Sequence, residues 1–172
     1  VVEERDARLP IEQTMERLPR GTRRLAAQLR TPAQIDSLWS VLTDYNRLSE
    51  FIPNLSLSKL IGRSGNRVKL EQVGSQKLIG VNFSAKVQLE LVEDHNDGCL
   101  RFYLIKGDFR RFEGAWRMKA LEDGGSCLFY ELIVQGCIGM PVALIEQRLR
   151  EDLKTNLLAV EKAAMTRYKS PN

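Results

Sequence analysis

The sequence has few of the residues from which common catalytic and metal centres are built. It contains one histidine, His95, in the segment EDHNDG, which reads as a hairpin turn whose tip is normally solvated. A single surface histidine argues against a triad built around a core histidine and against a histidine-rich metal site. No GxGxxG or GxxxxGK[ST] phosphate loop is present. The sequence therefore predicts no metal, no cofactor and no defined set of catalytic residues.

Cysteines and long apolar runs are also scarce. Cys99, Cys127 and Cys137 are odd in number, far apart and without CxxC spacing, which argues against a disulfide framework or a zinc site. This pattern is typical of a reducing compartment, and we predict that all three are small buried residues. No apolar run reaches the length of a membrane span, and the charged N-terminus does not resemble a signal peptide. We therefore expect a soluble chain.

What is present is typical of one globular domain. The 172 residues are 43% hydrophobic and 28% charged, which is enough for a sizeable core and short for two domains. The formal net charge of +4 is concentrated in RLPRGTRR and EQRLREDLK. Such a balance is compatible with contact to an anionic membrane or RNA, but mixed charge on a solvated face is the simpler interpretation.

The N-terminal part predicts an arm, a strand and two short helices. Residues 1–17 are charged and weakly patterned, and we expect a loose arm or a short helix there. From residue 21 onward, residues of the two faces alternate, which predicts a half-buried strand with Leu25, Ala27 and Leu29 facing the core. Thr31 opens a Thr-x-x-Gln capping box, which predicts a helix start. Asp44 is the expected cap of a second short helix that Pro53 ends.

The remaining sequence predicts six consecutive strands and one long helix. The turn-forming segments GRSGN, GSQ, DHNDG, KGD and EDGGS separate strand-like stretches, which indicates an antiparallel meander. From about Val142 to Ala164 the apolar period becomes helical, with the stripe Val142, Ile145, Leu149, Leu153, Leu157 and Val160. At about 1.5 Å per residue this helix is about 33 Å long, enough to cross a sheet.

Three segments resemble a known family. LTDYNRLSEFIPNL, GDFRRFEGAWRM and PVALIEQRLREDLKTNLLAVEKAA are similar to the START-like (SRPBCC, Bet v 1-like) superfamily, and most similar to its polyketide cyclase/dehydrase and coenzyme Q-binding branch in cyanobacteria and chloroplasts. The resemblance covers roughly residues 18–164. It implies an α+β helix-grip fold, in which a curved antiparallel sheet wraps around a long C-terminal helix and two short helices follow the first strand. It also suggests a cyanobacterial cytoplasm or a plastid stroma. We expect an arm (residues 1–17), one START-like domain (residues 18–168) and a tail (residues 169–172).

The resemblance also implies a cavity between sheet and helix that binds a small hydrophobic ligand. Small residues in the predicted sheet and helix would leave such a space, although they equally permit close packing: Gly74, Ala85, Gly114, Ala115, Ala143 and Ala159. Each candidate for the apolar wall of this cavity could instead be an ordinary residue of the hydrophobic core. The candidates are Phe83, Phe112, Trp116, Tyr130, Leu149 and Leu153. Asn156 borders the apolar stripe of the long helix, where a buried amide needs hydrogen-bond partners.

One apolar row of the predicted sheet ends in two charges. Counted backward by twos from Phe112, the inward face reaches Arg110 and then Asp108. We interpret the pair as lying at the cavity rim, where Arg110 would hydrogen-bond a ligand oxygen. The alternative is a solvated pair beyond the edge of the core, where a salt bridge contributes about 0–1 kcal/mol.

Three functions fit these observations, and the preferred one is binding or transport of a lipid, an isoprenoid quinone or a polyketide-like molecule. The second is a polyketide cyclase or dehydratase using Tyr103, Tyr130, Arg110 or Asp108, although no spacing selects these residues. The third is a ribosome-associated or peripheral membrane module with the basic residues Arg20, Arg23, Arg24, Arg148, Arg150 and Lys154. Glu146, Glu151 and Asp152 interrupt that face, and the lack of interleaved aromatic residues disfavours nucleic acid.

Overall fold

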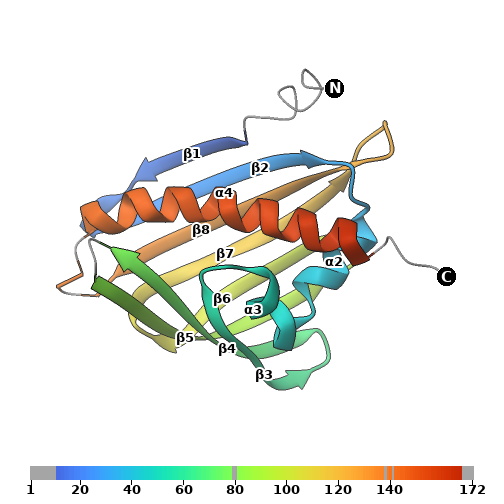
Figure 1. The fold of residues 1–172 in the computed structure, drawn as a ribbon. Coiled ribbons are helices and arrows are strands. Elements are labelled where there is room, and N and C mark those ends of the chain that lie inside the picture. Colours follow the sequence, from blue (N-terminus) through green and yellow to red (C-terminus); the bar gives the residue numbers. More distant parts are fainter. Residues whose placement is uncertain (1–10, 79–80, 138, 141, 168–172) are drawn as a thin grey trace.

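The protein is a curved antiparallel sheet with one long helix across its concave side (Figure 1). The computed structural model describes residues 11–78, 81–137, 139–140 and 142–167. Within these residues the sheet has eight strands in the order β1-β2-β8-β7-β6-β5-β4-β3. The strands are β1 (Glu12–Arg17), β2 (Arg23–Thr31), β3 (Leu55–Ser64), β4 (Arg67–Leu78), β5 (Val81–Asp94), β6 (Cys99–Gly107), β7 (Phe109–Ala120) and β8 (Ser126–Gly136). The predicted helix-grip fold is confirmed.

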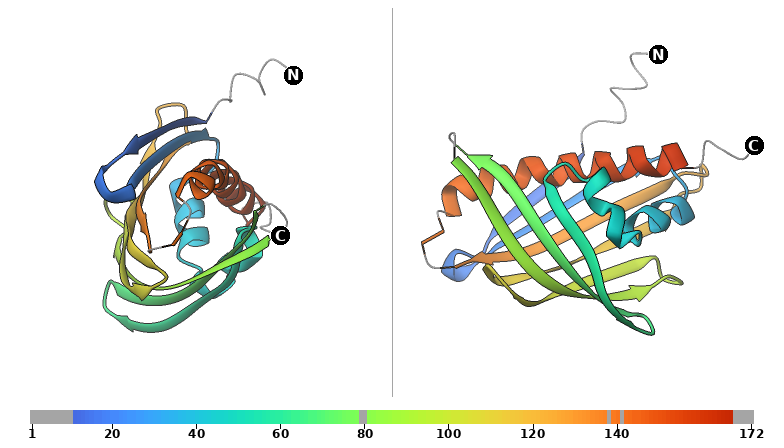
Figure 2. Two further views of the ribbon diagram at one scale, coloured as in Figure 1. Left: turned by 90° about the vertical axis from the view of Figure 1, so that its left-hand side faces the viewer. Right: turned by 60° about the horizontal axis from the view of Figure 1, so that its bottom comes forward.

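The helices lie inside the curve of the sheet, except η1 (Pro19–Gly21), which forms the turn between the first two strands (Figure 2). They are the single turns η1 and η2 (Tyr45–Arg47), the short helices α2 (Ile35–Leu42) and α3 (Leu48–Phe51), and the long α4 (Val142–Arg167). Viewed end-on, the strands curve around α4, and α2 packs beside it (Figure 2). The strand, the short helices, the six-stranded meander and the long helix therefore follow in the predicted order.

Residues 12–17 do not form the arm expected from the sequence. They form β1, which pairs antiparallel with β2 from Glu12 opposite Gln28 to Arg17 opposite Arg23. The strand lies at one edge of the sheet, where charged residues are common because one side of the backbone faces solvent. This placement explains the weak apolar pattern that made the segment look like an arm.

The predicted capping box at Thr31 is also wrong. Thr31 is the last residue of β2 and pairs with Ser126 of β8, so its backbone is committed to the sheet. Its Oγ1 accepts a hydrogen bond from the backbone N–H of Ala33 at 3.2 Å, which turns the chain, and α2 begins only at Ile35. The predicted side-chain cap is replaced by a short turn between strand and helix.

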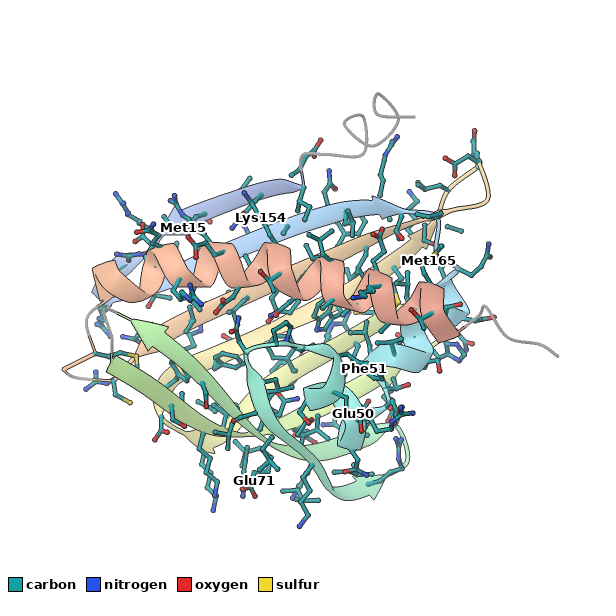
Figure 3. The ribbon with its side chains drawn as sticks, in the orientation of Figure 1. Met15, Glu50, Phe51, Glu71, Lys154 and Met165 are labelled. Carbon is teal, nitrogen blue, oxygen red and sulfur yellow. The ribbon has the colours of Figure 1, made fainter. Side chains whose placement is uncertain are left out.

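The long helix has one buried and one exposed face. Leu153, Leu157 and Val160 are buried, as the predicted stripe requires, while the side chains of Val142 and Ile145 lie outside the described part. Lys154 and Met165 lie on the outer side of the helix (Figure 3). The inward face therefore closes the concave side of the sheet.

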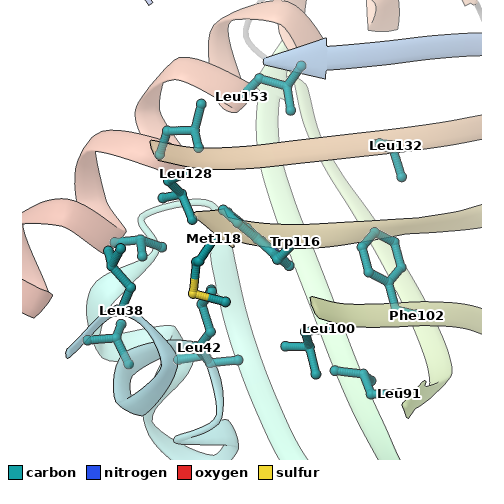
Figure 4. Packing of buried hydrophobic residues seen from close by; sticks show 14 of the residues in the cluster. Leu38, Leu42, Leu91, Leu100, Phe102, Trp116, Met118, Leu128, Leu132 and Leu153 are labelled. Carbon is teal, nitrogen blue, oxygen red and sulfur yellow. The ribbon is translucent and has the colours of Figure 1, made fainter. Parts of the chain in front are cut away.

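The hydrophobic core fills one end of this enclosure. Leucines from α2, β6 and β8, including Leu38, Leu100 and Leu128, pack with Met118 and Trp116 of β7 (Figure 4). These leucines are at most 1% exposed, so this end is closely packed. Leu100 and Trp116 also border the space that remains between sheet and helix, which reaches Leu149 and Leu153 of α4.

The cysteines and the histidine fit most of their predicted positions. Cys99 and Cys127 are buried as predicted. Cys137 is exposed because it lies just after the end of β8, so the prediction that it is buried was wrong. His95 is exposed at the turn between β5 and β6, and its ring stacks on Trp39 with the ring centroids 4.8 Å apart. Neither Cys137 nor His95 borders the space beneath α4.

Candidate functional site

A cavity of about 290 Å³ lies between the concave face of the sheet and α4. Strands β3 to β8 form one wall, α4 forms the opposite wall, and the end of α2, α3 and the residues before β3 close the side. Gly74 and Ala85 are among the lining residues, as their small size predicted. Gly114 is not: a Cβ at this position would collide with the carbonyl oxygen of Glu131, so this glycine allows β7 and β8 to approach closely.

An aromatic wall covers the sheet side of the cavity, formed by Phe102, Phe109, Phe112, Trp116 and Tyr130. Its rings are in mutual contact, with centroids 4.3 Å apart for Trp116 and Tyr130 and 5.2 Å apart for Phe109 and Phe112. Such contacts hold large side chains in fixed positions around the empty volume. The wall is therefore preformed.

The predicted wall residues largely meet at this cavity. Phe112, Trp116 and Tyr130 line it from the sheet, and Leu149 and Leu153 line it from α4. Phe83 belongs to β5, but its side chain lies outside the described part.

Sequence reasoning missed Phe102 and Phe109. Phe102 could have been found, because Leu100 and Phe102 alternate with exposed Arg101 along β6. Phe109 could not, because of an irregularity at the start of β7.

That irregularity is a bulge at the start of β7. Phe109 pairs with Gly136 of β8, whereas Arg111 pairs with Gln135, so β7 contains one extra residue between the two pairs. The bulge reverses the alternation and turns Phe109 toward the cavity beside Phe112. The apolar row is therefore continued by a phenylalanine.

The predicted rim position of Asp108 and Arg110 is consequently wrong. Both residues are exposed and neither lines the cavity. Asp108 instead accepts a hydrogen bond through Oδ2 from the backbone N–H of Lys86 at 2.7 Å, and its own N–H donates to the Lys86 carbonyl at 2.9 Å. Its carboxylate supports the backbone at the junction of β6 and β7 on the outside of the sheet.

The helix side of the cavity carries a polar pair. Asp152 and Asn156 are one helical turn apart on α4, so both reach the cavity from the same face. Asn54, in the segment before β3, donates from Nδ2 to Asp152 Oδ1 at 2.7 Å. Asn156 Oδ1 is buried and has no hydrogen-bond partner among the described residues. We call Asn54, Asp152 and Asn156 the polar cluster.

Ionisation of Asp152 is unfavourable in the folded protein because its carboxyl group is buried. Burial raises the pKa of its carboxyl group to about 6, although the nearby Arg148 guanidinium, with Nε 3.9 Å from Oδ1, acts in the opposite direction. Sequence reasoning treated Asp152 only as an interruption of a basic face. Its spacing of four residues from Asn156, beside the apolar stripe, is the signal that would have placed it in the cavity.

Tyr130 provides a hydroxyl on the sheet side. Burial raises its pKa well above the usual range, so the phenol stays protonated and can donate a hydrogen bond. Tyr103, the other tyrosine considered for catalysis, is 43% exposed and does not line the cavity.

The basic residues considered as an interaction face are largely paired with acidic side chains. Arg23 Nε lies 2.9 Å from Glu146 Oε2, and Arg148 Nη1 lies 3.2 Å from Glu151 Oε2. Arg24 forms a similar contact with Glu131 at 3.2 Å. None of the helices in the described residues has the length and apolarity of a membrane span.

A family described as polyketide cyclase/dehydrase and lipid transport matches residues 31–161. The chain belongs to this family. No curated protein matches the chain.

Several solved structures share the fold of this member of the polyketide cyclase/dehydrase and lipid transport family. The protein TTHA0849 from Thermus thermophilus superposes with a TM-score of 0.76 at 19% identity, covering 85% of this chain and 99% of that one. The Zhui aromatase/cyclase from Streptomyces sp. R1128 gives 0.75 at 13% identity, covering 87% and 97%. A STAR-related lipid transfer protein from Xanthomonas axonopodis gives 0.69 at 17% identity, covering 89% and 98%. At these identities the likeness establishes the START-like fold.

Proposed function

We propose that the protein binds a small lipophilic molecule in the cavity between the sheet and α4. The observation that carries this proposal is the unfilled, mostly apolar space of about 290 Å³ beside a closely packed core. An empty apolar cavity lacks the dispersion contacts that a ligand of matching shape would supply. Its volume lies just below the range of about 300–1,000 Å³ for small-molecule sites, so a compact ligand is favoured.

The similar proteins support the same class of ligand. They include a lipid transfer protein and an aromatase/cyclase, and the family description combines lipid transport with polyketide chemistry. The candidate ligands are accordingly a lipid or a polyketide-like molecule, and the isoprenoid quinone expected from the sequence is a third. The aromatic wall would contact the apolar body of any of these, and the polar cluster would orient it.

Native mass spectrometry of the protein purified from its own source tests this proposal. We expect a bound compound close to a one-to-one ratio, which denaturation releases for identification. The variant Ala85→Phe, which places a large ring at the cavity wall, should lose the compound. The matched variant Arg101→Phe adds the same ring on the opposite face of the sheet and should retain it. Protein that is repeatedly empty, or retention by Ala85→Phe, would contradict the proposal.

Catalysis on a polyketide-like substrate is the second candidate. It is supported by the presence of two titratable groups, Asp152 and Tyr130, in the same cavity. A carboxyl group with a pKa near 6 is suited to proton transfer at neutral pH. This function predicts conversion of the bound compound, and loss of that conversion in Asp152→Asn or Tyr130→Phe. Release of the compound unchanged after long incubation would favour a carrier instead.

The interaction module receives less support. Four arginines of the proposed basic face form ion pairs with Glu146, Glu131 and Glu151, which leaves less free positive charge for phosphates: Arg23, Arg24, Arg148 and Arg150.

A further inference from the structure

The wall of the cavity contains one charged group. Among the described residues that line the cavity, Asp152 alone is charged at neutral pH, and this set includes no arginine, lysine or histidine. The other lining residues are apolar or carry neutral polar groups, such as Asn54, Gln72 and Tyr130. Within the described part of the chain, the wall therefore offers a carboxylate and no cation to a ligand.

The arginine beside Asp152 does not cancel this charge. Arg148 Nε lies 3.9 Å from Asp152 Oδ1, and Arg148 Nη1 lies 3.2 Å from Glu151 Oε2, so two carboxylates share one guanidinium. Arg148 is not among the residues that line the cavity, and its side chain is 34% exposed, so solvent screens its charge. Asn54 donates a hydrogen bond to Asp152 but contributes no charge. The potential inside the cavity is therefore negative.

Two effects oppose the binding of an anion in such a cavity. A charge that leaves water for an apolar space loses its hydration, and only an opposite charge together with hydrogen bonds compensates for this loss. The described wall offers no opposite charge, and the Asp152 carboxylate repels a second negative charge. An uncharged ligand of the same shape encounters neither effect.

We propose that Asp152 is a specificity-determining residue, which excludes anionic lipophiles such as free fatty acids from the cavity and admits uncharged ones. This inference rests on the proposed function, since it specifies which lipophilic molecules enter the same cavity. Uncharged ligands are not distinguished from one another in this way, because neutral side chains of the wall, such as Gln72 and Tyr130, can both donate and accept hydrogen bonds.

Two probes of nearly equal shape test the effect of charge: 2-naphthamide, which is neutral, and 2-naphthoate, which is an anion. Their dissociation constants are measured by calorimetry with ligand-free protein at pH 8, where Asp152 is ionised because its pKa is about 6. We expect the wild type to bind 2-naphthamide at least about tenfold more tightly than 2-naphthoate. At an effective dielectric constant of about 20, repulsion between two like charges about 10 Å apart is sufficient for such a difference.

Two variants on α4 assign the discrimination to Asp152. Asp152→Asn removes the charge and keeps the shape, so it should strengthen the binding of 2-naphthoate about tenfold and leave that of 2-naphthamide nearly unchanged. Retained binding of the amide shows that the cavity of the variant is intact. The control Glu151→Gln removes the preceding carboxylate, which is 56% exposed and does not line the cavity, and should change the binding of either probe by less than about threefold.

Each result has a distinct meaning. Equal or tighter binding of 2-naphthoate by the wild type would overturn the role of Asp152 and leave the proposed binding function standing. The same conclusion would follow from a preference that is unchanged in Asp152→Asn, or from an equal gain for 2-naphthoate in Glu151→Gln. Failure of both probes to bind to the wild type would overturn the proposed function as well.

Discussion

Replacing Asp152 by asparagine is expected to stabilise the folded protein at neutral pH. The wild-type carboxyl group is buried beside an apolar cavity, and its side chain is 11% exposed. Asparagine has almost the same shape, and its Oδ1 can still accept the hydrogen bond from Asn54. The substitution therefore removes the charge and keeps the contact.

The size of the effect follows from the pKa. Burial moves the carboxyl pKa from its ordinary value of 3.8 to about 6. Because one pKa unit corresponds to about 1.4 kcal/mol, ionised Asp152 lowers the free energy of unfolding by about 3 kcal/mol. The folded state binds more protons than the unfolded state between about pH 4 and pH 6, so this cost grows as the pH rises through that window. It is absent below pH 4 and complete above pH 6.

Urea unfolding at pH 4 and pH 7.5, followed by tryptophan fluorescence, measures the effect. We expect Asp152→Asn to be more stable than the wild type by about 3 kcal/mol at pH 7.5 and nearly equal to it at pH 4. The control Glu122→Gln removes an exposed carboxylate and should follow the wild type at both pH values. The reasoning is refuted if Asp152→Asn gains nothing at pH 7.5, or if it gains equally at both.

Three further predictions concern other parts of the molecule. Phe109→Ala should weaken ligand binding and should lower the free energy of unfolding by less than the roughly 3–5 kcal/mol of a fully buried phenylalanine. Arg110→Ala should leave binding unchanged, because the bulge turns Arg110 away from the cavity. A binding titration in which Arg110→Ala has the larger effect would contradict this orientation. Gly114→Ala should cost about 1–3 kcal/mol in denaturant unfolding because its Cβ meets the main chain of β8, while Gly62→Ala, with open space around it, should cost less than half as much. Cys137 should react with a thiol reagent in the native state well before the two buried cysteines, and equal rates for all three would contradict their burial.

Periodicity in the sequence was sufficient for most of the fold. Leu25, Ala27 and Leu29 gave β2, and the turn segments gave the six strands of the meander, because a half-buried strand must alternate between core and solvent. The apolar stripe through Leu153 and Val160 predicted α4, because a helix with one buried face places an apolar residue at every third or fourth position.

Features that depend on neighbouring strands could not be predicted in this way. The role of Thr31 is decided by its pairing with Ser126, which lies far away in the chain. The orientation of Arg110 is decided by a bulge that becomes visible only against β8. Local pattern carries no information about either partner, so both residues were assigned to the wrong environment.

The candidate site was predicted where it is apolar and only partly where it is polar. Phe112, Trp116 and Tyr130 were assigned to the wall of the cavity that the family resemblance implied, and Asn156 was singled out because it lies beside an apolar stripe. Asp152 was missed because a carboxylate in a charged segment looks solvated until its partner, Asn54, is known from the fold.

The edges of the sheet bear on how the protein behaves at high concentration. β3 forms one edge and exposes Leu57 and Ile61, which are 40% and 42% exposed. Its pairing with β4 is interrupted twice, between Leu55 and Leu57 and between Leu60 and Gly62, and the exposed Lys59 lies between the interruptions. An irregular, positively charged edge is a poor template for a strand of another molecule. The interruptions in β3 should therefore disfavour pairing of this edge with a strand of a second molecule at high protein concentration.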